Sequence, residues 1–224
     1  MSDRPARSRL LFVRHGESVV TVRQMVGGEL SCEGLSDLGR RQAEALRDRW
    51  QGGGESRLDA IWSSTLPRAA ETAQVVAEGL GMEVSQHADL VEQRPGEADG
   101  VRFADFPARF GMPDWESRPH APMAPGGESV AAFHHRTSAA IEEVASAHEG
   151  QTVMVVCHGG VIDVAFRYLL DLPRYGHFDL WTLNCSVSEF SVDDSGDRRG
   201  RWRLVRYNDA AHLAGLPRET PREG

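Results

Sequence analysis

The sequence has no lysine, few cysteines and no long apolar run. A membrane-spanning helix needs about 20 consecutive, mostly apolar residues, and no segment approaches that length. The first nine residues are polar and lack the apolar stretch of a secretory signal peptide. We therefore expect a soluble, cytoplasmic protein with no membrane partner.

The cysteines argue against a disulfide framework. Cys32, Cys157 and Cys185 include no Cys-x-x-Cys pair, and a single disulfide would leave one thiol over. A thiolate zinc site, which uses such close pairs, is not expected either. We interpret the three thiols as buried or incidental.

Positive charge comes from arginine alone and is outnumbered by negative charge. The 25 arginines face 33 acidic residues, which gives a net charge of −8. This balance argues against nonspecific binding to nucleic acid or to an anionic membrane. With 224 residues, of which 40% are hydrophobic, the chain is long enough to bury the core of one α/β domain.

Two unbroken apolar segments predict buried parallel strands. Residues 10–13 lead into Arg14-His15-Gly16, and residues 152–157 lead into His158-Gly159-Gly160. Arg68 follows a shorter predicted strand. Because ligands of an open α/β sheet bind outside the carboxyl ends of its strands, these side chains are expected to converge on one small-molecule site.

Capping and helix-breaking residues predict most of the remaining elements. Ser36 is expected to cap a helix that ends before Gly52. Thr65 is expected to cap a helix with Pro67 in its first turn, closed by Gly81. The other predicted elements are a loop over 19–35, strands over 59–64 and 82–86, a helix opening at Glu128-Ser129 and ending near Gly150, a helix over 161–170, and a hairpin of 186–192 and 202–207.

Residues 88–127 interrupt this rhythm with several prolines, glycines and scattered aromatic residues. An irregular segment of this length is commonly a lid or a binding segment. Its arginines and aromatic residues are candidates for a wall that determines substrate specificity. These candidates are Arg94, Arg102, Arg109, Arg118, Phe103, Phe106 and Trp115.

Short motifs in a fixed order point to one known family. They are Arg14-His15-Gly16-Glu17; Leu35 to Ala43 with Gly39 and Gln42; Ser63-Ser64 with Arg68 and Glu71-Thr72-Ala73; Leu90-x-Glu92 with Gly96 and Gly100; Pro125-Gly126-Gly127-Glu128-Ser129; His158-Gly159-Gly160; Asn184-Cys185-Ser186-Val187; and Asn208-Asp209-x-x-His212-Leu213. Their order resembles that of the histidine phosphatase superfamily, whose fold is phosphoglycerate-mutase-like. The resemblance implies a single domain over residues 1–224: a three-layer α/β/α sandwich with a mostly parallel central sheet and a short cap segment at 93–125.

The resemblance assigns His15 as the nucleophile that forms a phosphohistidine, with Arg14, Arg68 and His158 as its catalytic, phosphate-binding partners. A nucleophilic imidazole must be neutral, with one ring nitrogen free and the other held by a hydrogen bond. The two guanidinium groups would disfavour the imidazolium and would neutralise charge on the phosphoryl oxygens. Backbone N–H groups of Gly159 and the glycine after it, at a helix start, would add to the anion site.

Glu92 is the expected general acid, which protonates the leaving oxygen and then activates water. Glu97 lies close by in the sequence and is the competing candidate. The spacing Leu-x-Glu-x-x-x-Gly-x-x-x-Gly of the family favours Glu92.

One position departs from the family pattern. Many family members have an asparagine six residues after the nucleophile, where it helps to hold the phosphate, and this chain has Thr21. A hydroxyl donates one hydrogen bond, whereas an amide donates two. Phosphate binding is therefore expected to be reorganised, with Ser18 contributing beside Thr21.

The short segment 93–125 favours a phosphatase, because the cofactor-dependent mutases of the family carry a longer insertion here that protects the phosphohistidine from water. We expect a metal-independent phosphomonoesterase that needs no cofactor and hydrolyses a small-molecule phosphomonoester. The alternatives are a cofactor-dependent phosphoglycerate-type mutase and a catalytically silent phosphoester-binding protein. A metal-dependent hydrolase has no supporting ligand motif in the sequence. Homodimers are common in the family, and a homodimer is compatible with this sequence.

The remaining histidines have no motif that supports a role in catalysis. For His87, His134, His135, His148 and His177, an exposed or structural position is the default expectation.

Overall fold

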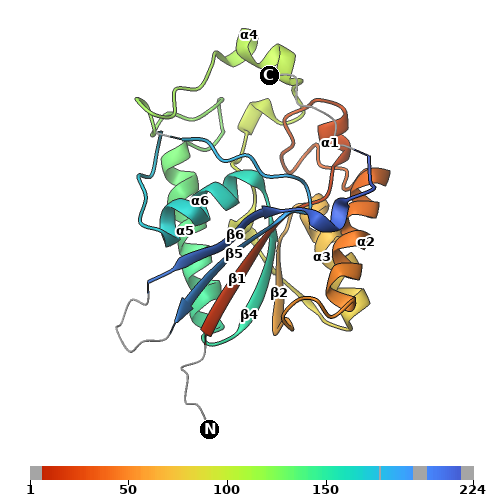
Figure 1. Cartoon of the computed structure of the whole chain (residues 1–224). Helices are drawn as coiled ribbons and strands as arrows, with labels where there is room; N and C mark the ends of the chain where they lie inside the picture. Colours follow the sequence, from red (N-terminus) through yellow and green to blue (C-terminus); the bar gives the residue numbers. More distant parts are fainter. Residues whose placement is uncertain (1–6, 177, 194–200, 218–224) are drawn as a thin grey trace.

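A computed structural model of the chain describes residues 7–176, 178–193 and 201–217, and its centre is a six-stranded sheet (Figure 1). The strands lie in the order β3-β2-β4-β1-β5-β6. Neighbours among β1 to β4 are parallel, whereas β5 runs antiparallel to both β1 and β6. Their bounds are β1 Arg7–Arg14, β2 Ala60–Ser64, β3 Val84–His87, β4 Thr152–Cys157, β5 Val187–Asp193 and β6 Arg203–Asp209. The predicted mostly parallel sheet is confirmed.

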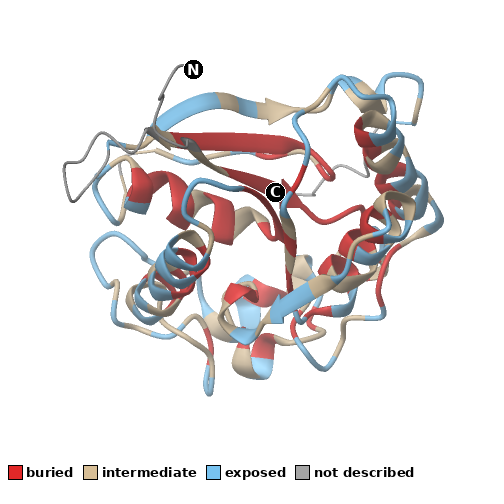
Figure 2. Cartoon of the chain, turned by 90° about the horizontal axis from the view of Figure 1, so that it is seen from below, coloured by how far each residue is buried: buried red, intermediate tan, exposed pale blue. Residues whose placement is uncertain are grey.

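Helices cover both faces of the sheet and complete the predicted three layers (Figure 1). On one face lie α2 Asp37–Gln51 and α3 Pro67–Leu80, and on the other lie α5 Val130–Ala147 and α6 Gly159–Leu169. Alternate residues of β1 supply both cores: Leu10 and Phe12 pack with α5 and α6, and Leu11 and Val13 pack with α2 and α3. This burial on two sides, visible as the red central strands of Figure 2, explains why the apolar run is unbroken.

Helix starts depend on the capping residues that the sequence indicates, with one exception. Ser36 and Ser129 each accept a backbone N–H bond in the first turn of α2 and of α5. The prediction of Thr65 as the cap of α3 was wrong, because the N-cap is Leu66. Pro67 restricts the residue before it to extended backbone, which is the conformation that an N-cap adopts.

The helix after β4 also differs from its prediction. It begins at Gly159 rather than at Val161, so both glycines of the motif lie in its first turn. The N-cap is His158, which makes no capping bond with its side chain. The imidazole is therefore available to the site at the end of the sheet.

Irregular segments lie above the layers in the view of Figure 1, where α4 marks the top. The single-turn helix α1 (Val19–Val22) interrupts the segment predicted as a loop. Residues 88–110 contain three 3₁₀ helices and one short α-helix, which are η1 Ala88–Leu90, η2 Gly96–Ala98, η3 Phe103–Asp105 and α4 Phe106–Phe110. All but η1 lie within 93–125, the segment predicted as the cap.

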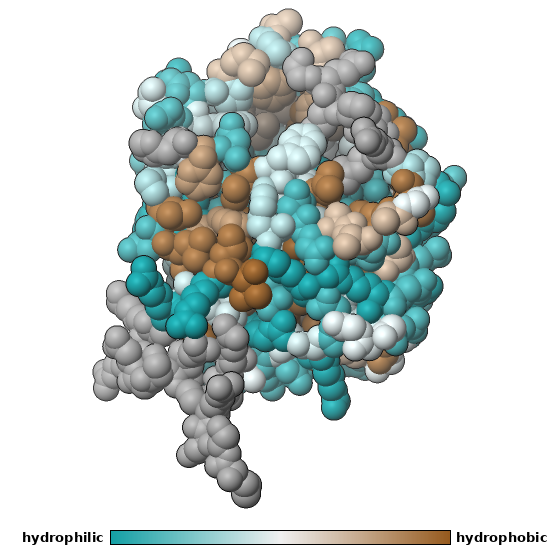
Figure 3. Space-filling model, viewed as in Figure 1, coloured by the Kyte–Doolittle hydropathy of each residue, from teal (hydrophilic) through white to brown (hydrophobic). Residues whose placement is uncertain are grey.

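The predicted hairpin is formed by β5 and β6, while residues 194–200 of its turn lie outside the described residues. The outer strand β6 exposes Leu204 and Val205, and Figure 3 shows apolar patches among the polar surface on this side of the molecule. After β6 comes the 3₁₀ helix η4 (Ala211–Leu213). All three cysteines are free thiols. Within the described ranges, no helix has the length and apolar character to cross a membrane.

Candidate active site

The register of the central strands brings the two predicted histidines together. Arg14 at the end of β1 is paired with Cys157 at the end of β4, so the residue after each strand lies at the same level. The backbone N–H of His15 donates to the Cys157 carbonyl at 3.0 Å. The rings of His15 and His158 have their centroids 5.1 Å apart.

Residues of three family motifs hold the backbone around the first histidine. Thr72 on α3 accepts the Gly16 N–H at 3.0 Å, and Gln42 on α2 accepts the Glu17 N–H at 2.8 Å. Asn184, before β5, donates its side-chain amide to the His15 carbonyl at 2.7 Å. These motif residues thus form a scaffold that orients the histidine loop.

Two glycines allow α2 to approach this loop. A Cβ at Gly16 would lie 2.5 Å from the Gly39 carbonyl oxygen, and a Cβ at Gly39 would lie 2.0 Å from the Glu17 carbonyl oxygen. Both distances are far below a normal contact, so larger residues would separate the loop from the helix. Close packing of the loop against α2 therefore explains why both positions are glycine.

The hydrogen bonds of His15 define which ring nitrogen faces the site. Nδ1 lies 2.7 Å from the Gly16 carbonyl oxygen, which can only accept a proton, so Nδ1 carries the hydrogen. Nε2 accepts a bond from Nε of Arg68 at 3.1 Å. The lone pair of Nε2 is thus directed toward the Arg68 guanidinium, the side from which an anionic substrate would be attacked.

The two predicted arginines are buried beside this ring, each only 4% exposed. Arg14 Nη1 donates to the Thr182 carbonyl, and Arg68 Nη2 donates to the Gly27 carbonyl at 3.1 Å. Arg68 Nη1 is buried and has no hydrogen-bond partner within the described part of the chain. The arrangement therefore offers a guanidinium N–H to an anion.

His158 is fully buried and is held from the other side. Its Nε2 lies 2.8 Å from Oγ of Ser64, the last residue of β2. Burial, together with the positive charge of Arg68 and the neighbouring His15 and Arg14, holds the pKa of His158 well below its usual value. The ring is therefore neutral near pH 7 and carries a single proton.

Glu92 lines the same cavity, and backbone groups orient its carboxylate. Oε1 accepts the Gln93 N–H and Oε2 accepts the Gly160 N–H, both at 3.0 Å. A Cβ at Gly160 would lie 2.2 Å from Glu92 Oε1. The expectation that the Gly160 N–H serves the anion site was wrong, because that N–H holds the carboxylate. Glu97 is exposed and does not line the cavity.

An ion pair that the sequence analysis missed holds the loop that carries Glu92. Arg136 on α5 forms two bonds of 2.8 Å to the Glu128 carboxylate. Its Nη1 also donates to the carbonyls of Asp89 and Val91, and its Nη2 donates to that of Glu92. Arg136 therefore ties the general-acid candidate to the long helix.

Ser18 and Thr21 both line the cavity, as expected for substrate-binding residues. Their hydroxyl oxygens lie 2.9 Å apart and form one hydrogen bond. Gly159 lines the cavity as well. The position where an asparagine was expected thus presents a pair of hydroxyls.

The cavity has a volume of about 750 Å³, and the cap supplies only part of its wall. Of the seven specificity candidates, Phe103 and Trp115 line it, while the four arginines and Phe106 do not. Arg102 is paired with Asp105 on the surface, and Arg94 lies near Asp89. Two of the four arginines of this segment thus lie beside acidic side chains.

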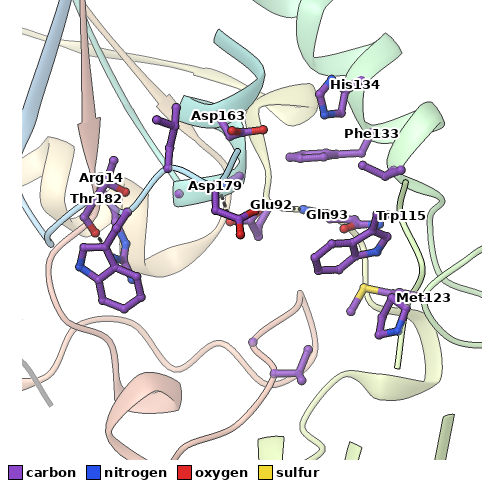
Figure 4. A pocket seen from close by; sticks show the side chains of 18 of the residues that line it. Arg14, Glu92, Gln93, Trp115, Met123, Phe133, His134, Asp163, Asp179 and Thr182 are labelled. Carbon is purple, nitrogen blue, oxygen red and sulfur yellow. Dashed lines mark hydrogen bonds between the residues drawn. The ribbon is translucent and has the colours of Figure 1, made fainter. Parts of the chain in front are cut away.

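The opposite wall comes from residues that the sequence analysis did not single out. Figure 4 shows Glu92, Asp163 and Asp179 between Arg14 and the side chain of Trp115. Burial raises the pKa of Asp163, although a hydrogen bond from Arg167 opposes this. The wall residues from α6 and the segment before β5 are Asp163, Arg167, Arg174, Tyr175, Gly176, Phe178, Asp179, Leu180, Trp181 and Thr182. The only signal in the sequence is the density of aromatic and charged residues between the predicted helix and the hairpin.

His134 also lines this cavity, so one of the histidines expected to be exposed or structural borders the site. Burial and the charges of Arg167 and Arg174 lower its pKa to about 4. His148 accepts a bond from the Trp62 indole, which is a structural position as expected, and His135 is exposed. His177 lies outside the described residues. Among the described residues, no cluster of three or more His, Cys, Asp or Glu side chains is placed to hold a metal ion.

The comparisons with known proteins agree with this geometry. The model of "Histidine phosphatase superfamily (branch 1)" matches residues 10–210. Phosphoglycerate mutase-like protein 4 of Arabidopsis thaliana is 31% identical over 92% of this chain and 87% of that protein. Phosphoserine phosphatase 1 of Hydrogenobacter thermophilus is 30% identical over 92% of this chain and 94% of that protein.

A solved structure extends the likeness to three dimensions. The mycobacterial glucosyl-3-phosphoglycerate phosphatase, solved with VO₃, has a TM-score of 0.74 and 28% identity over 90% of this chain and 99% of that chain. The residues matched by the family model include Arg14, His15, Arg68, Glu92 and His158. The chain belongs to branch 1 of the histidine phosphatase superfamily.

Proposed function

We propose that this protein is a metal-independent phosphatase that hydrolyses a small-molecule phosphomonoester through a phosphohistidine on His15. The observation that carries the proposal is the state of the His15 ring. Its Nδ1–H is held by the Gly16 carbonyl, and its Nε2 lone pair points toward Arg68. A neutral, oriented imidazole beside guanidinium groups is what nucleophilic attack on a phosphate dianion requires.

In the first step, Nε2 attacks phosphorus, the bond from phosphorus to the ester oxygen breaks, and a proton from Glu92 goes to the leaving alcohol. Arg14, Arg68 and His158 stabilise the charge on the phosphoryl oxygens in the transition state. Glu92 enters this step protonated and leaves it as a carboxylate.

In the second step, Glu92 takes a proton from water, and the water oxygen attacks the phosphohistidine. The phosphorus–nitrogen bond breaks, and its electron pair returns to Nε2 of His15. Inorganic phosphate is released, and Glu92 is protonated again, so one water is consumed for each ester cleaved.

The position of Glu92 supports its role as the acid that protonates the leaving group. Two backbone N–H groups orient the carboxylate at the cavity wall, whereas Glu97 is exposed and does not line the cavity. Ser18 and Thr21 are proposed to bind the phosphate in place of the family's asparagine, which their joined hydroxyls at the cavity wall support.

The substrate is proposed to be a small phosphorylated metabolite. Relatives carry the names phosphoserine phosphatase and glucosyl-3-phosphoglycerate phosphatase, which makes phosphoserine and phosphoglycerate esters the first compounds to test. We also propose that residues 93–125 act as the cap of a single domain, since Phe103 and Trp115 from this segment line the cavity. A cytoplasmic location and a homodimer are further expectations.

The test is phosphate release from a panel of phosphomonoesters in the presence of EDTA. The panel includes phosphoserine, 3-phosphoglycerate, sugar phosphates and an activated aryl phosphate. His15→Ala should abolish release, whereas His135→Ala, which changes an exposed histidine, should leave it unchanged. Release that survives His15→Ala, or that disappears with EDTA in the wild type, would refute the proposed mechanism.

A further inference from the structure

Ser64 ends β2 beside His158 but belongs to none of the groups proposed above to touch the phosphate. Both Ser64 and His158 are completely buried. Ser64 Oγ has two contacts, the Leu66 backbone N–H at 3.2 Å and the His158 Nε2 at 2.8 Å. The single ring proton of a neutral His158 lies either on Nδ1 or on Nε2.

The hydroxyl of a serine has one hydrogen to donate and can accept from others. The Leu66 N–H is a donor, so Oγ is the acceptor in that hydrogen bond and its own hydrogen is not used there. Among the described residues, the hydroxyl hydrogen of Ser64 has one acceptor within reach, which is Nε2 of His158. If Nε2 carried the proton instead, the buried hydroxyl hydrogen would be left without an acceptor, which is unfavourable for a group shielded from water.

The other ring nitrogen supports the same assignment. His158 Nδ1 is buried and has no hydrogen-bond partner within the described part of the chain. Since the low pKa of His158 keeps the ring neutral, a proton on Nδ1 makes this atom a buried donor without a partner among the described residues, as Arg68 Nη1 is. A lone pair at the same position would repel a phosphoryl oxygen.

We propose that Ser64 is a positioning residue that fixes the tautomer of His158, so that its Nδ1–H donates to the substrate phosphoryl group. The catalytic consequence rests on the proposed function, whereas the tautomer itself does not. His15 and His158 then each carry their proton on Nδ1, but His15 presents Nε2 to the phosphate and His158 presents Nδ1. His15 offers the Nε2 lone pair as nucleophile, and His158 offers an N–H to the developing charge.

The direct test is the protonation state of each ring nitrogen, read from two-bond proton–nitrogen correlation spectra of protein with isotope-labelled histidine. The His158 signals are assigned by their loss in His158→Gln. In the wild type near neutral pH, Nδ1 should show the shift of a protonated ring nitrogen and Nε2 that of an unprotonated one. A protonated Nε2 in the wild-type spectrum would overturn the proposal without the need for any variant of Ser64.

The variant test compares Ser64→Ala with Ser63→Ala. Ser63 is equally buried and adjacent, but its Oγ has no hydrogen-bond partner among the described residues. In Ser64→Ala, the signals of His158 should move toward the Nε2-protonated form, whereas Ser63→Ala should keep the wild-type pattern. An unchanged tautomer in folded Ser64→Ala would also overturn the proposal.

Kinetics separate this inference from the proposed function. If both hold, Ser64→Ala should lower kcat by tenfold or more, up to the roughly hundredfold seen when one donor is removed from an oxyanion site. Ser63→Ala should stay within about twofold of the wild type. If His15→Ala retains activity, the proposed function fails while the spectra still decide the tautomer. If His15 is essential and the spectra shift, but Ser64→Ala keeps full activity, the positioning role is wrong.

Discussion

Arg136→Met is the change whose effect the structure allows us to work out most fully. The Arg136 and Glu128 side chains are 10% and 9% exposed, and they share two bonds of 2.8 Å. Removal of one partner from a buried ion pair leaves the other charge without compensation, which costs about 3–5 kcal/mol. The carbonyls of Asp89, Val91 and Glu92 lose a donor as well, each bond contributing about 1 kcal/mol.

These contributions are not independent, and Glu128 keeps two contacts with Arg94: its backbone N–H at 3.2 Å and its partly exposed guanidinium at 3.9 Å. We therefore expect Arg136→Met to lower the free energy of unfolding by about 3–5 kcal/mol, out of a total of roughly 5–15 kcal/mol for a domain. The measurement is denaturant unfolding by circular dichroism, extrapolated linearly to zero denaturant.

The double variant Arg136→Met/Glu128→Gln tests the cause of the loss. It removes the uncompensated carboxylate, so it should be less destabilised than Arg136→Met alone. Arg102→Met is the control, because its pair with Asp105 is exposed and should contribute no more than about 1 kcal/mol. A loss below about 1 kcal/mol in Arg136→Met, or a double variant less stable than the single one, would refute the reasoning.

Two further predictions follow from the site and from the buried histidines. Glu92→Gln should slow esters with poor leaving groups much more than an activated aryl phosphate, because only the former need a proton from the acid; equal losses on both, measured as kcat/KM, would exclude the acid role. The pKa of His134 and that of His212 are both lowered from 6.5 to about 4 by burial. Since the unfolded chain binds these protons more readily, stability should be complete above pH 6.5 and fall as the pH drops toward 4, with a slope of at most about 1.4 kcal/mol per pH unit for each histidine. Thermal unfolding of His134→Leu across this range should show a shallower decline than the wild type, and a decline as steep as that of the wild type would refute the assignment.

At two positions, another residue takes the role that the sequence predicts for a helix start. Thr65 has the side chain of a good cap, but the proline two residues later restricts Leu66 to extended backbone and moves the helix start. The Gly160 N–H lies at a helix start, as an anion site requires, yet a carboxylate from a distant loop already accepts it. The first competition lies within three consecutive residues of the sequence, whereas the second depends on a contact that residue types and spacing do not show.

The arginines of residues 93–125 also show that residue type and position in the sequence do not identify what a side chain contacts. A cation in a segment near a predicted phosphate site suggests that it binds the substrate. Arg102 and Arg94 instead lie beside acidic residues of the surrounding surface. Arg136, with no motif around it, was not singled out, although it holds the loop of Glu92. Whether an arginine faces substrate, a carboxylate or a carbonyl depends on contacts between residues far apart in the chain.

The sequence by itself determined the central strands, the main helices and the histidines at the strand ends. These features depend on periodicity, capping and apolar runs, which act over a few residues and leave a local pattern. Tertiary structure alone decided three features of the site. They are which ring nitrogen of His15 and of His158 carries the proton, the cavity wall formed by α6 and the segment before β5, and the bonds from Arg136 to the loop of Glu92. Each of these depends on which donor meets which acceptor across the fold, such as Ser64 from β2 at 2.8 Å from a histidine after β4.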